Sequence, residues 1–273
     1  MTKGKIRQFF VKYLPDYRTG RRVKVPLWKI VRAILYKLKT GIQWKNPPMK
    51  ELFGNCKYSW ESVYYHFNKW SKMGVWEECY QNILSDNKKE LDMSIVNLDG
   101  THTPAKRGGD AVGYQGRKKQ KTTNMLILSD NQGVPVGWTS PIKGEHNDSF
   151  ELKKKAEKIF KKMEAINLPI RGLVLNADAG FDVGSFKELC EKNEILHNID
   201  ENKRNRKENV GNYSYSFDNE LYKNRFCVEQ LNAWVDGFKS LIIRYETSAE
   251  NWLSLHALAF SIIFIRKFSE FNI

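Results

Sequence analysis

The hydrophobic pattern changes its period near residue 93, and this change constrains the fold more than any other feature. Upstream, apolar residues recur at helical spacing. Downstream, the runs SIVNLD, TTNMLILSD and VPVGWTS (residues 94–99, 122–130 and 134–140) are typical of short strands. Turn residues separate the last two runs, so a β-meander is predicted.

Helices and strands alternate in the following segment. Asp148 is expected to cap a helix, with Glu151 three positions later. A strand is expected at 171–178, a helix at 183–192 and a strand at 195–199. The resulting β-β-β-α-β-α-β-α order predicts a mixed α/β domain with helices on the faces of its sheet.

The last quarter of the chain begins with a polar segment, residues 200–220, where alternating aromatic residues indicate a loop with a short hairpin edge. Helices are expected near 221–239 and 249–267. The most apolar stretch, residues 252–265, is shorter than the roughly 20 residues that cross a bilayer. It predicts a buried helix, and neither a membrane partner nor secretion is expected.

The first third of the chain is basic and helical. Pro26 and Gly41 bound one amphipathic helix, Ser59 is the candidate N-cap of a second that stops before Gly74, and a short helix is expected at 75–85. Residues 1–90 carry 19 basic and 7 acidic side chains, so this third holds +12 of the net charge of +14. That excess favours a polyanionic partner. We predict an all-helical domain over residues 1–90 and a second domain over 91–273.

Cysteine usage argues against a disulfide framework or a zinc finger. The four cysteines lie far apart, and no Cys/His cluster has zinc-finger spacing. This pattern is typical of reduced thiols in a cytoplasmic protein.

Three acidic residues are candidates for metal binding and catalysis. Asp99 ends the first strand, Asp178 ends the fourth, and Glu229 lies in the helix YKNRFCVEQLNAW. Neighbouring strand ends can bring two carboxylates together, and a helix crossing that edge can supply a third. Such a cluster favours Mg²⁺ or Mn²⁺, and a pair of ions can hold both the attacking and leaving oxygens of a phosphodiester.

The residue pattern alone also leaves structural roles open for these acids. Asp99 precedes a glycine and Asp178 lies in DAGFD, so each is also a turn former. Asp182 is the expected N-cap of the next helix. Glu229 is equally well a solvated side chain.

Tyr222, Arg225 and Glu229 fall on one helical stripe, at i, i+3 and i+7. A guanidinium beside a metal-binding carboxylate suits phosphate binding, because its fork matches phosphate oxygens. An intrahelical ion pair between Arg225 and Glu229 is the alternative.

Five motifs, in this order, resemble those of the bacterial insertion-sequence DDE transposases, most closely the insertion sequence 5 group. They are GRRVKVPLWKIVRAILYKLKTGIQWKNPP with SWESVYYHFNKWSKMGVWE, then LDGTHTPAK, GEHNDSFEL, LNADAGFD and RFCVEQLNAWVDGFKSLIIRYE. The resemblance spans roughly Gly20 to Phe268. It implies a ribonuclease-H-like catalytic domain preceded by a helix-turn-helix-type domain.

The resemblance places the family's catalytic and metal-binding acids on Asp99, Asp178 and Glu229. It implies cleavage at the ends of a mobile element and strand transfer into target DNA, with Mg²⁺ or Mn²⁺ and two ions. Tyr222 and Arg225 match the phosphate-gripping positions of the last motif. Its final basic position is Asp236 here, and the nearest basic residue is Lys239.

The expected partner is double-stranded DNA, bound by a homodimer in the nucleoid. Candidate contacts fall in the segment before the first helix, on the second helix, and in the basic run RKKQK. They are Arg21, Arg22, Lys24, Tyr65, His66, Lys69, Lys72, Arg117, Lys118, Lys119 and Lys121. An ordinary solvated face and a charged hairpin turn are the alternatives for these groups.

Two other functions share these features. A decayed or repurposed transposase would bind DNA without cutting it. A stand-alone ribonuclease-H-like nuclease would share the acids, but it gives no reason for a basic helical domain.

Overall fold

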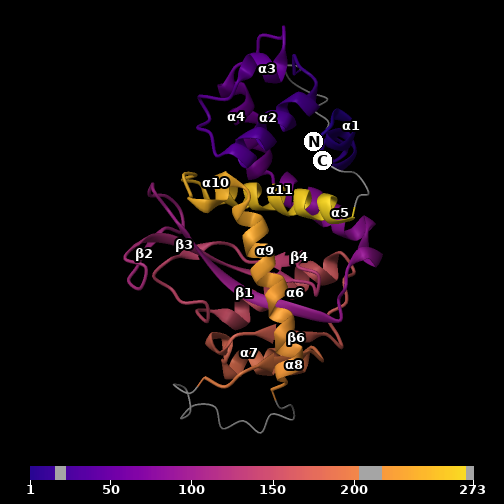
Figure 1. The fold of residues 1–273 in the computed structure, drawn as a ribbon, viewed down its shortest axis with the longest axis vertical. Coiled ribbons are helices and arrows are strands. Elements are labelled where there is room, and N and C mark those ends of the chain that lie inside the picture. The colour runs from indigo at the N-terminus through magenta and orange to yellow at the C-terminus, as the bar shows by residue number, and fades with distance from the viewer. Residues whose placement is uncertain (16–22, 203–216, 269–273) are drawn as a thin grey trace. The chain divides into compact units, whose positions relative to one another are not determined.

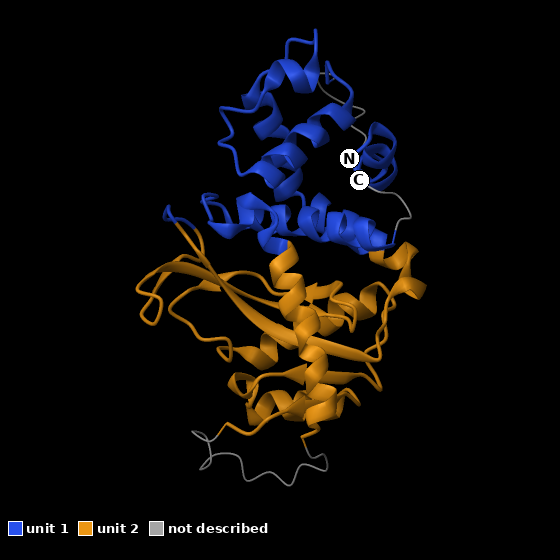
Figure 2. Ribbon diagram, in the orientation of Figure 1, with its two compact units in different colours: residues 1–83, 106–109, 235–273 blue, residues 84–105, 110–234 orange. Residues whose placement is uncertain are grey.

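Two compact units make up the chain, and the computed structural model describes residues 1–15, 23–202 and 217–268. Unit 1 contains residues 1–83, 106–109 and 235–273, and unit 2 contains residues 84–105 and 110–234 (Figure 2). The C-terminal segment therefore belongs to the same unit as the N-terminal helices. The bounds of these units differ from those of the predicted domains 1–90 and 91–273. The assignment of DNA binding to the first domain and catalysis to the second remains a prediction.

Unit 1 is helical, as the sequence predicts for the first third. Its α-helices are α1 (Lys3–Phe9), α2 (Leu27–Thr40), α3 (Met49–Phe53), α4 (Trp60–Lys72), most of α5 (Val75–Asp86), α10 (Lys239–Ile242) and α11 (Ala249–Phe268). Gly41 ends α2 at φ +69°, where a side chain would be strained. Ser59 caps α4 by accepting a hydrogen bond of 3.3 Å from the Ser62 N–H. Both predicted helix ends are confirmed.

The buried core of unit 1 centres on α11. All but one of its residues from Asn251 to Ile265 are buried, which confirms the buried helix predicted from the apolar stretch. Helix α11 packs against α2 and α4. Within the described ranges, no helix is both long and apolar enough to span a membrane.

His256 lies at the centre of α11 and gives unit 1 a sensitivity to acid. Its ring is 2% exposed, and Nδ1 lies 3.0 Å from the Trp252 carbonyl oxygen. Burial lowers the pKa of His256 to about 4. Between the unfolded pKa of about 6.5 and this value, the unfolded chain binds a proton that the folded chain does not, so we expect stability to fall by about 3 kcal/mol as pH drops through this range.

Chemical denaturation at pH 7.5 and pH 4.5 measures this effect. His256→Gln should lose less stability than the wild type between the two values. His146→Gln, at a ring that is 32% exposed, should match the wild type. Equal pH dependence in His256→Gln and wild type would contradict the prediction.

Unit 2 is built on a mixed sheet, to which the described residues contribute seven strands. The strands are β1 (Ile95–Pro104), β2 (Gly113–Gln115), β3 (Gln120–Ser129), β4 (Pro135–Trp138), β5 (Ile142–Lys143), β6 (Val174–Ala177) and β7 (Leu196–Ile199). The order is β2-β3-β1-β6-β7, and β4 and β5 also pair with β3. Strand β3 is antiparallel to β1, whereas β6 is parallel to both β1 and β7. The predicted mixed sheet and meander are confirmed.

The two faces of the sheet are covered by different helices. Side chains alternate along β1, so Val96 and Leu98 point into the hydrophobic core that α6 (Leu152–Ala165) and α7 (Gly184–Lys192) complete. Asn97 and Asp99 point to the opposite face. Helix α9 (Phe226–Asp236) crosses this second face (Figure 1).

Two predicted helix caps are wrong. Helix α6 begins after Glu151, which has φ +49°, and Asp148 instead accepts a hydrogen bond of 2.8 Å from the Asn124 amide. Val183, not Asp182, precedes α7. Asp182 forms a buried ion pair of 2.6 Å with Lys187. In both cases the carboxylate binds another side chain instead of capping the helix: Asp148 binds Asn124, and Asp182 binds Lys187.

The predicted helix over 221–239 is divided into shorter pieces. These are α8 (Asn219–Tyr222), the 3₁₀ turn η4 (Lys223–Arg225), α9 and the start of α10. The predicted hairpin with Tyr213 and Tyr215 lies outside the described residues.

Candidate active site

Asp99 and Asp178 lie at equivalent positions of adjacent parallel strands. The register pairs Asn97 of β1 with Asn176 of β6, and each Asp follows its Asn by two residues. A two-residue step keeps a side chain on the same face of an extended strand. The two carboxylates therefore face the same side of the sheet. Asp178 directly follows the end of β6, but the prediction that Asp99 ends its strand is wrong, because β1 continues to Pro104 in its antiparallel pairing with β3.

Asp178 also forms the local turn that its sequence allows. Its Oδ1 accepts a hydrogen bond of 2.7 Å from the Gly180 N–H, at the start of the 3₁₀ turn η3 (Ala179–Phe181). The turn-forming role and the position beside Asp99 are thus compatible.

Asp99 is bound through both of its carboxylate oxygens. Arg225 Nη2 lies 2.9 Å from Oδ1, and Asn232 Nδ2 lies 3.0 Å from Oδ2. The Asp99 side chain is 20% exposed and that of Arg225 is 13% exposed, so the pair is largely shielded from water.

Burial dominates the ionisation of Asp99. It raises the pKa of this carboxyl above the ordinary Asp value, and the charge of Asp178 adds to the increase while Arg225 opposes it. Burial of Arg225 is the largest single effect and acts against its charge, but Asp99, Tyr222 and Asp178 together outweigh it and raise the guanidinium pKa. Arg225 therefore remains charged and partly balances two neighbouring acids.

The predicted stripe of Tyr222, Arg225 and Glu229 runs through α8, the 3₁₀ turn η4 and α9. Arg225 Nη1 lies 3.3 Å from the Tyr222 hydroxyl, and the guanidinium lies 5.6 Å from the centre of the ring. Among the described residues, the ion pair of Arg225 is with Asp99 and not with Glu229. The alternative of an intrahelical pair is wrong.

Glu229 is exposed in the first turn of α9. It lies four residues after Arg225 and three before Asn232, so it shares the helix stripe that contacts Asp99. Within the described part of the chain, no group of three His, Cys, Asp or Glu side chains is arranged to hold a metal. The structure thus brings Asp99 and Asp178 together, and does not bring Glu229 into a three-acid cluster.

The site contains one residue that the sequence analysis missed. Asn232 lies seven positions after Arg225 and contacts the other oxygen of the same carboxylate. Its helical spacing was readable from the sequence. Its partner, 133 positions away in the chain, was not.

The DNA-contact candidates of unit 1 lie mainly on α4. Tyr65 is 59% exposed, and Lys69 Nζ lies 6.0 Å from the centre of its ring. Lys72 is also exposed, whereas His66 is half-buried against Trp70. Burial, and then the charge of Lys69, lowers the pKa of His66 and favours its neutral form.

The remaining candidates are dispersed. Lys24 is exposed before α2, and Lys239 is the first residue of α10. Arg117, Lys118 and Lys119 lie in the exposed turn between β2 and β3, and Lys121 is exposed at the start of β3. Arg21 and Arg22 lie outside the described residues.

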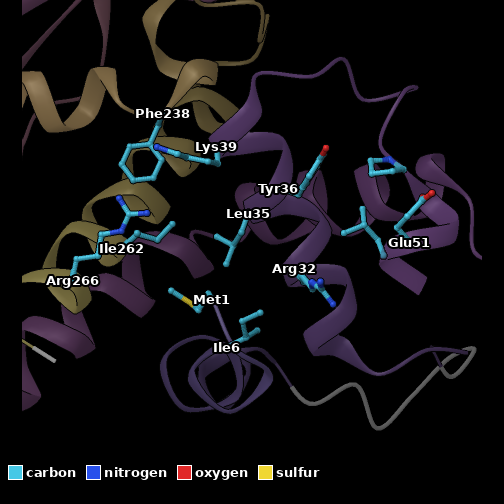
Figure 3. Close-up of a pocket in the computed structure, with 12 residues that line it drawn as sticks. Met1, Ile6, Arg32, Leu35, Tyr36, Lys39, Glu51, Phe238, Ile262 and Arg266 are labelled. Carbon is cyan, nitrogen blue, oxygen red and sulfur yellow. The ribbon is translucent and has the colours of Figure 1, made fainter. Parts of the chain in front are cut away.

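A cavity of about 380 Å³ lies in unit 1 (Figure 3). Its wall combines apolar side chains such as Leu35 and Ile262 with three cations, Arg32, Lys39 and Arg266. None of the predicted catalytic acids lines it. The candidate catalytic acids therefore lie outside this cavity.

Comparison with known families now defines the class of protein. Residues 90–264 match the model of the transposase DDE domain, and the chain belongs to this family. Residues 6–80 match a second model, described as a putative transposase of the IS4/5 family. The predicted membership of the insertion-sequence DDE transposases is confirmed, and with it the enzyme class. The mixed sheet of unit 2 agrees with the predicted α/β fold class.

Solved structures give only remote likenesses. The Mos1 transposase paired-end complex with left transposon end is 12% identical, with TM-score 0.30, over 90% of this chain and 79% of that one. The simian T-cell lymphotropic virus intasome in complex with PP2A regulatory subunit B56 gamma is 13% identical, with TM-score 0.35. That match covers 60% of this chain and 48% of that one, so the likeness spans about half of the intasome chain. No curated protein matches the sequence.

Proposed function

We propose that this DDE transposase cuts DNA at the ends of a mobile element and joins them to target DNA, using Asp99, Asp178 and Glu229. The observation that carries the assignment is the strand register, which sets Asp99 and Asp178 side by side on one sheet face. Arg225 and Asn232 on Asp99 support the same location.

The donor chemistry of the site fits a hard divalent cation. Asp99 and Asp178 provide only oxygen ligands, which Mg²⁺ and Mn²⁺ prefer, and Glu229 stands on the adjoining helix stripe. These three residues would hold two ions, which lower the pKa of bound water and so provide a nucleophile at neutral pH. Arg225 and Asn232 each occupy one lone pair of the Asp99 carboxylate, so both oxygens keep a further lone pair for an ion.

Arg225 has two roles in this proposal. Before DNA binds, its guanidinium balances the charge of Asp99 and keeps the acids from repelling each other. When DNA is bound, its fork is available for the oxygens of the phosphate to be cut, and Tyr222 orients it through the 3.3 Å contact. Hydrolysis frees a 3′ hydroxyl, and that hydroxyl then attacks a phosphate of the target DNA.

DNA binding is assigned to the basic helical part of the chain, which carries +12 over residues 1–90. Exposed Tyr65 and Lys72 of α4, with half-buried Lys69 between them, are proposed contacts for the element end, and the basic β2–β3 turn for the DNA backbone. Because two element ends must be cut and joined together, we propose a homodimer on DNA, acting on the DNA of the nucleoid.

Metal removal tests the proposed reaction. Purified full-length protein is incubated with a labelled duplex of its element end in Mg²⁺, in Mn²⁺ or in excess EDTA. We expect nicking and strand transfer with either ion and a rate at least about 1,000-fold lower in EDTA, because no other group in the site can activate water.

Gel-shift measurements on the same duplex provide the control. Binding should persist in EDTA, since contacts from basic side chains to DNA phosphates do not use the metal. Binding without nicking under every divalent ion would instead identify a non-catalytic DNA-binding protein. Digestion of RNA/DNA hybrids without strand transfer would identify a nuclease.

A further inference from the structure

Three asparagines form a continuous row through the buried part of the sheet in unit 2. Asn97, Asn176 and Asn198 lie on β1, β6 and β7, and the registers place them directly beside one another. Each side chain is 0% exposed. Such positions in adjoining parallel strands usually carry apolar residues, because both faces of the sheet are covered.

The row is joined by hydrogen bonds between the side-chain amides. Asn198 Nδ2 donates to Asn176 Oδ1 over 2.9 Å, and Asn176 Nδ2 donates to Asn97 Oδ1 over 3.2 Å. Burying amides costs free energy unless they are hydrogen-bonded. These bonds therefore offset much of the cost of placing the three side chains inside the fold, and Asn97 Nδ2 is the one amide nitrogen of the row that has no hydrogen-bond partner among the described residues.

The same amides also bind the backbone at α8, the short helix that precedes η4 and α9, where Arg225, Glu229 and Asn232 lie. Asn176 Nδ2 donates to the Leu221 carbonyl over 2.8 Å. Asn198 Nδ2 donates to the Asp218 carbonyl over 2.9 Å, and Asn198 Oδ1 accepts from the Asp218 N–H over 2.8 Å. Asp218 is in turn the N-cap of α8, since its carboxylate accepts from the Glu220 and Leu221 N–H groups.

These bonds fix the helix along the direction of the strands. Asn97 and Asn176 precede Asp99 and Asp178 by two residues on the same strands, and Leu221 precedes Arg225 by four residues. The row therefore holds the backbone before Arg225 at a set level relative to the two acids. Apolar packing alone is non-directional and would define that level less sharply.

We propose that the Asn97, Asn176 and Asn198 row is a positioning device for the active site, which aligns Arg225, Glu229 and Asn232 with Asp99 and Asp178. This inference rests on the proposed function, because it assigns these five residues to one site. The three asparagines touch no substrate. They act through the helix that they hold.

Asn198→Ala tests the proposal, because Asn198 makes both contacts to Asp218. We expect the cleavage rate of DNA-bound enzyme to fall roughly 100-fold, as misplacement of a catalytic group by about 1 Å can cost that much. Affinity for the element end should stay unchanged. Asn198→Ser keeps one hydroxyl for the Asp218 backbone and should recover part of the rate. It is also the fallback if the alanine variant does not fold.

Hydrogen exchange measured by mass spectrometry provides a readout that does not depend on activity. Peptides covering residues 218–236 should exchange at least about tenfold faster in Asn198→Ala, while peptides from β1 and β3 keep the wild-type rate. Asn193→Ala is the matched control. It removes a half-buried Asn of unit 2 whose amide, among the described residues, donates to the Leu189 carbonyl in the last turn of α7.

The outcomes separate the two proposals. Wild-type rates and exchange in Asn198→Ala, when the wild type cleaves DNA, overturn the positioning role and leave the transposase function intact. If the wild type and Asn193→Ala cleave no DNA, the proposed function fails, and exchange over residues 218–236 alone decides whether the row holds the helix.

Discussion

Asp99→Asn should abolish DNA cleavage, with a loss of at least about 1,000-fold, while the protein still binds the element end. An amide is nearly the same size as the carboxylate but carries no charge, so it cannot help to hold a divalent ion. It also leaves Arg225, whose side chain is 13% exposed, without its ion-pair partner. Single-turnover cleavage with saturating enzyme measures the chemical step separately from binding.

The direction of the change in DNA affinity distinguishes a specific loss of cleavage from misfolding of the variant. Removing the negative charge of Asp99 lowers the repulsion of DNA phosphates, so affinity should be equal to that of the wild type or higher. Asp178→Asn and Glu229→Gln should also lose cleavage if these residues complete the site. Unchanged activity for Glu229→Gln would limit the catalytic acids to Asp99 and Asp178.

Asp92→Asn is the matched control for this experiment. Asp92 lies in the same unit, just before β1, and its carboxylate binds Ser94 and Asn131 rather than the site. Cleavage by this variant should stay close to the wild-type rate. An Asp99→Asn enzyme that cuts DNA within about tenfold of the control would remove Asp99 from the mechanism.

Glu246→Ala should produce the largest loss of stability, about 3–5 kcal/mol. The Glu246 side chain is 8% exposed, lies 3.6 Å from Lys37 Nζ and accepts a hydrogen bond of 2.9 Å from Trp44 Nε1. Burial already lowers the pKa of Lys37, and the Glu246 carboxylate opposes this decrease. Its removal leaves an ammonium group buried without a counter-charge.

Equilibrium unfolding in denaturant at neutral pH measures this loss. Glu246→Gln keeps an acceptor for Trp44 and should lose less than Glu246→Ala. Lys37→Met combined with Glu246→Ala should recover much of the stability, because it removes the uncompensated charge. Glu250→Ala, at an exposed position in the first turn of α11, should change stability by no more than about 0.5 kcal/mol. A loss below about 1 kcal/mol for Glu246→Ala would show that the buried pair contributes little.

The elements that the sequence predicted well are those with local signals. Gly41 and Ser59 mark real helix ends because each acts through its own backbone or the next turn. Strands β1, β3 and β4 carry apolar runs long enough to recognise. Strands β2 and β5 have three and two residues, too few to show a period.

The predictions that failed depend on contacts that the local pattern does not show. Asp148 and Asp182 have the sequence context of helix caps, but Asn124 binds the carboxylate of Asp148 and Lys187, inside α7, binds that of Asp182. The sequence offered a phosphate or Glu229 as the partner of Arg225, and the fold pairs it with Asp99 instead. The asparagine row is also hidden from the sequence, because each Asn lies in a different strand and only the register aligns them.

The juxtaposition of Asp99 and Asp178 was predictable only in part. Both follow apolar strand runs in the sequence, but β1 continues past Asp99 to Pro104, so the register of β1 with β6 brings the two acids together rather than two strand ends. The sequence constrains the position of Glu229 less, because that position depends on where the helix begins that follows the polar segment 200–220. Its assignment still depends on the resemblance to known transposases.

The discontinuous make-up of unit 1 affects how the protein can be divided experimentally. Lys37 belongs to the N-terminal helices and Glu246 to the last forty residues, so neither stretch holds a complete set of buried charges. A fragment that stops near residue 90, or a truncated product of premature termination, would expose the apolar surfaces of α2 and α4 that α11 covers. Such fragments should aggregate or be degraded, so DNA recognition is best studied in a polypeptide that keeps both ends.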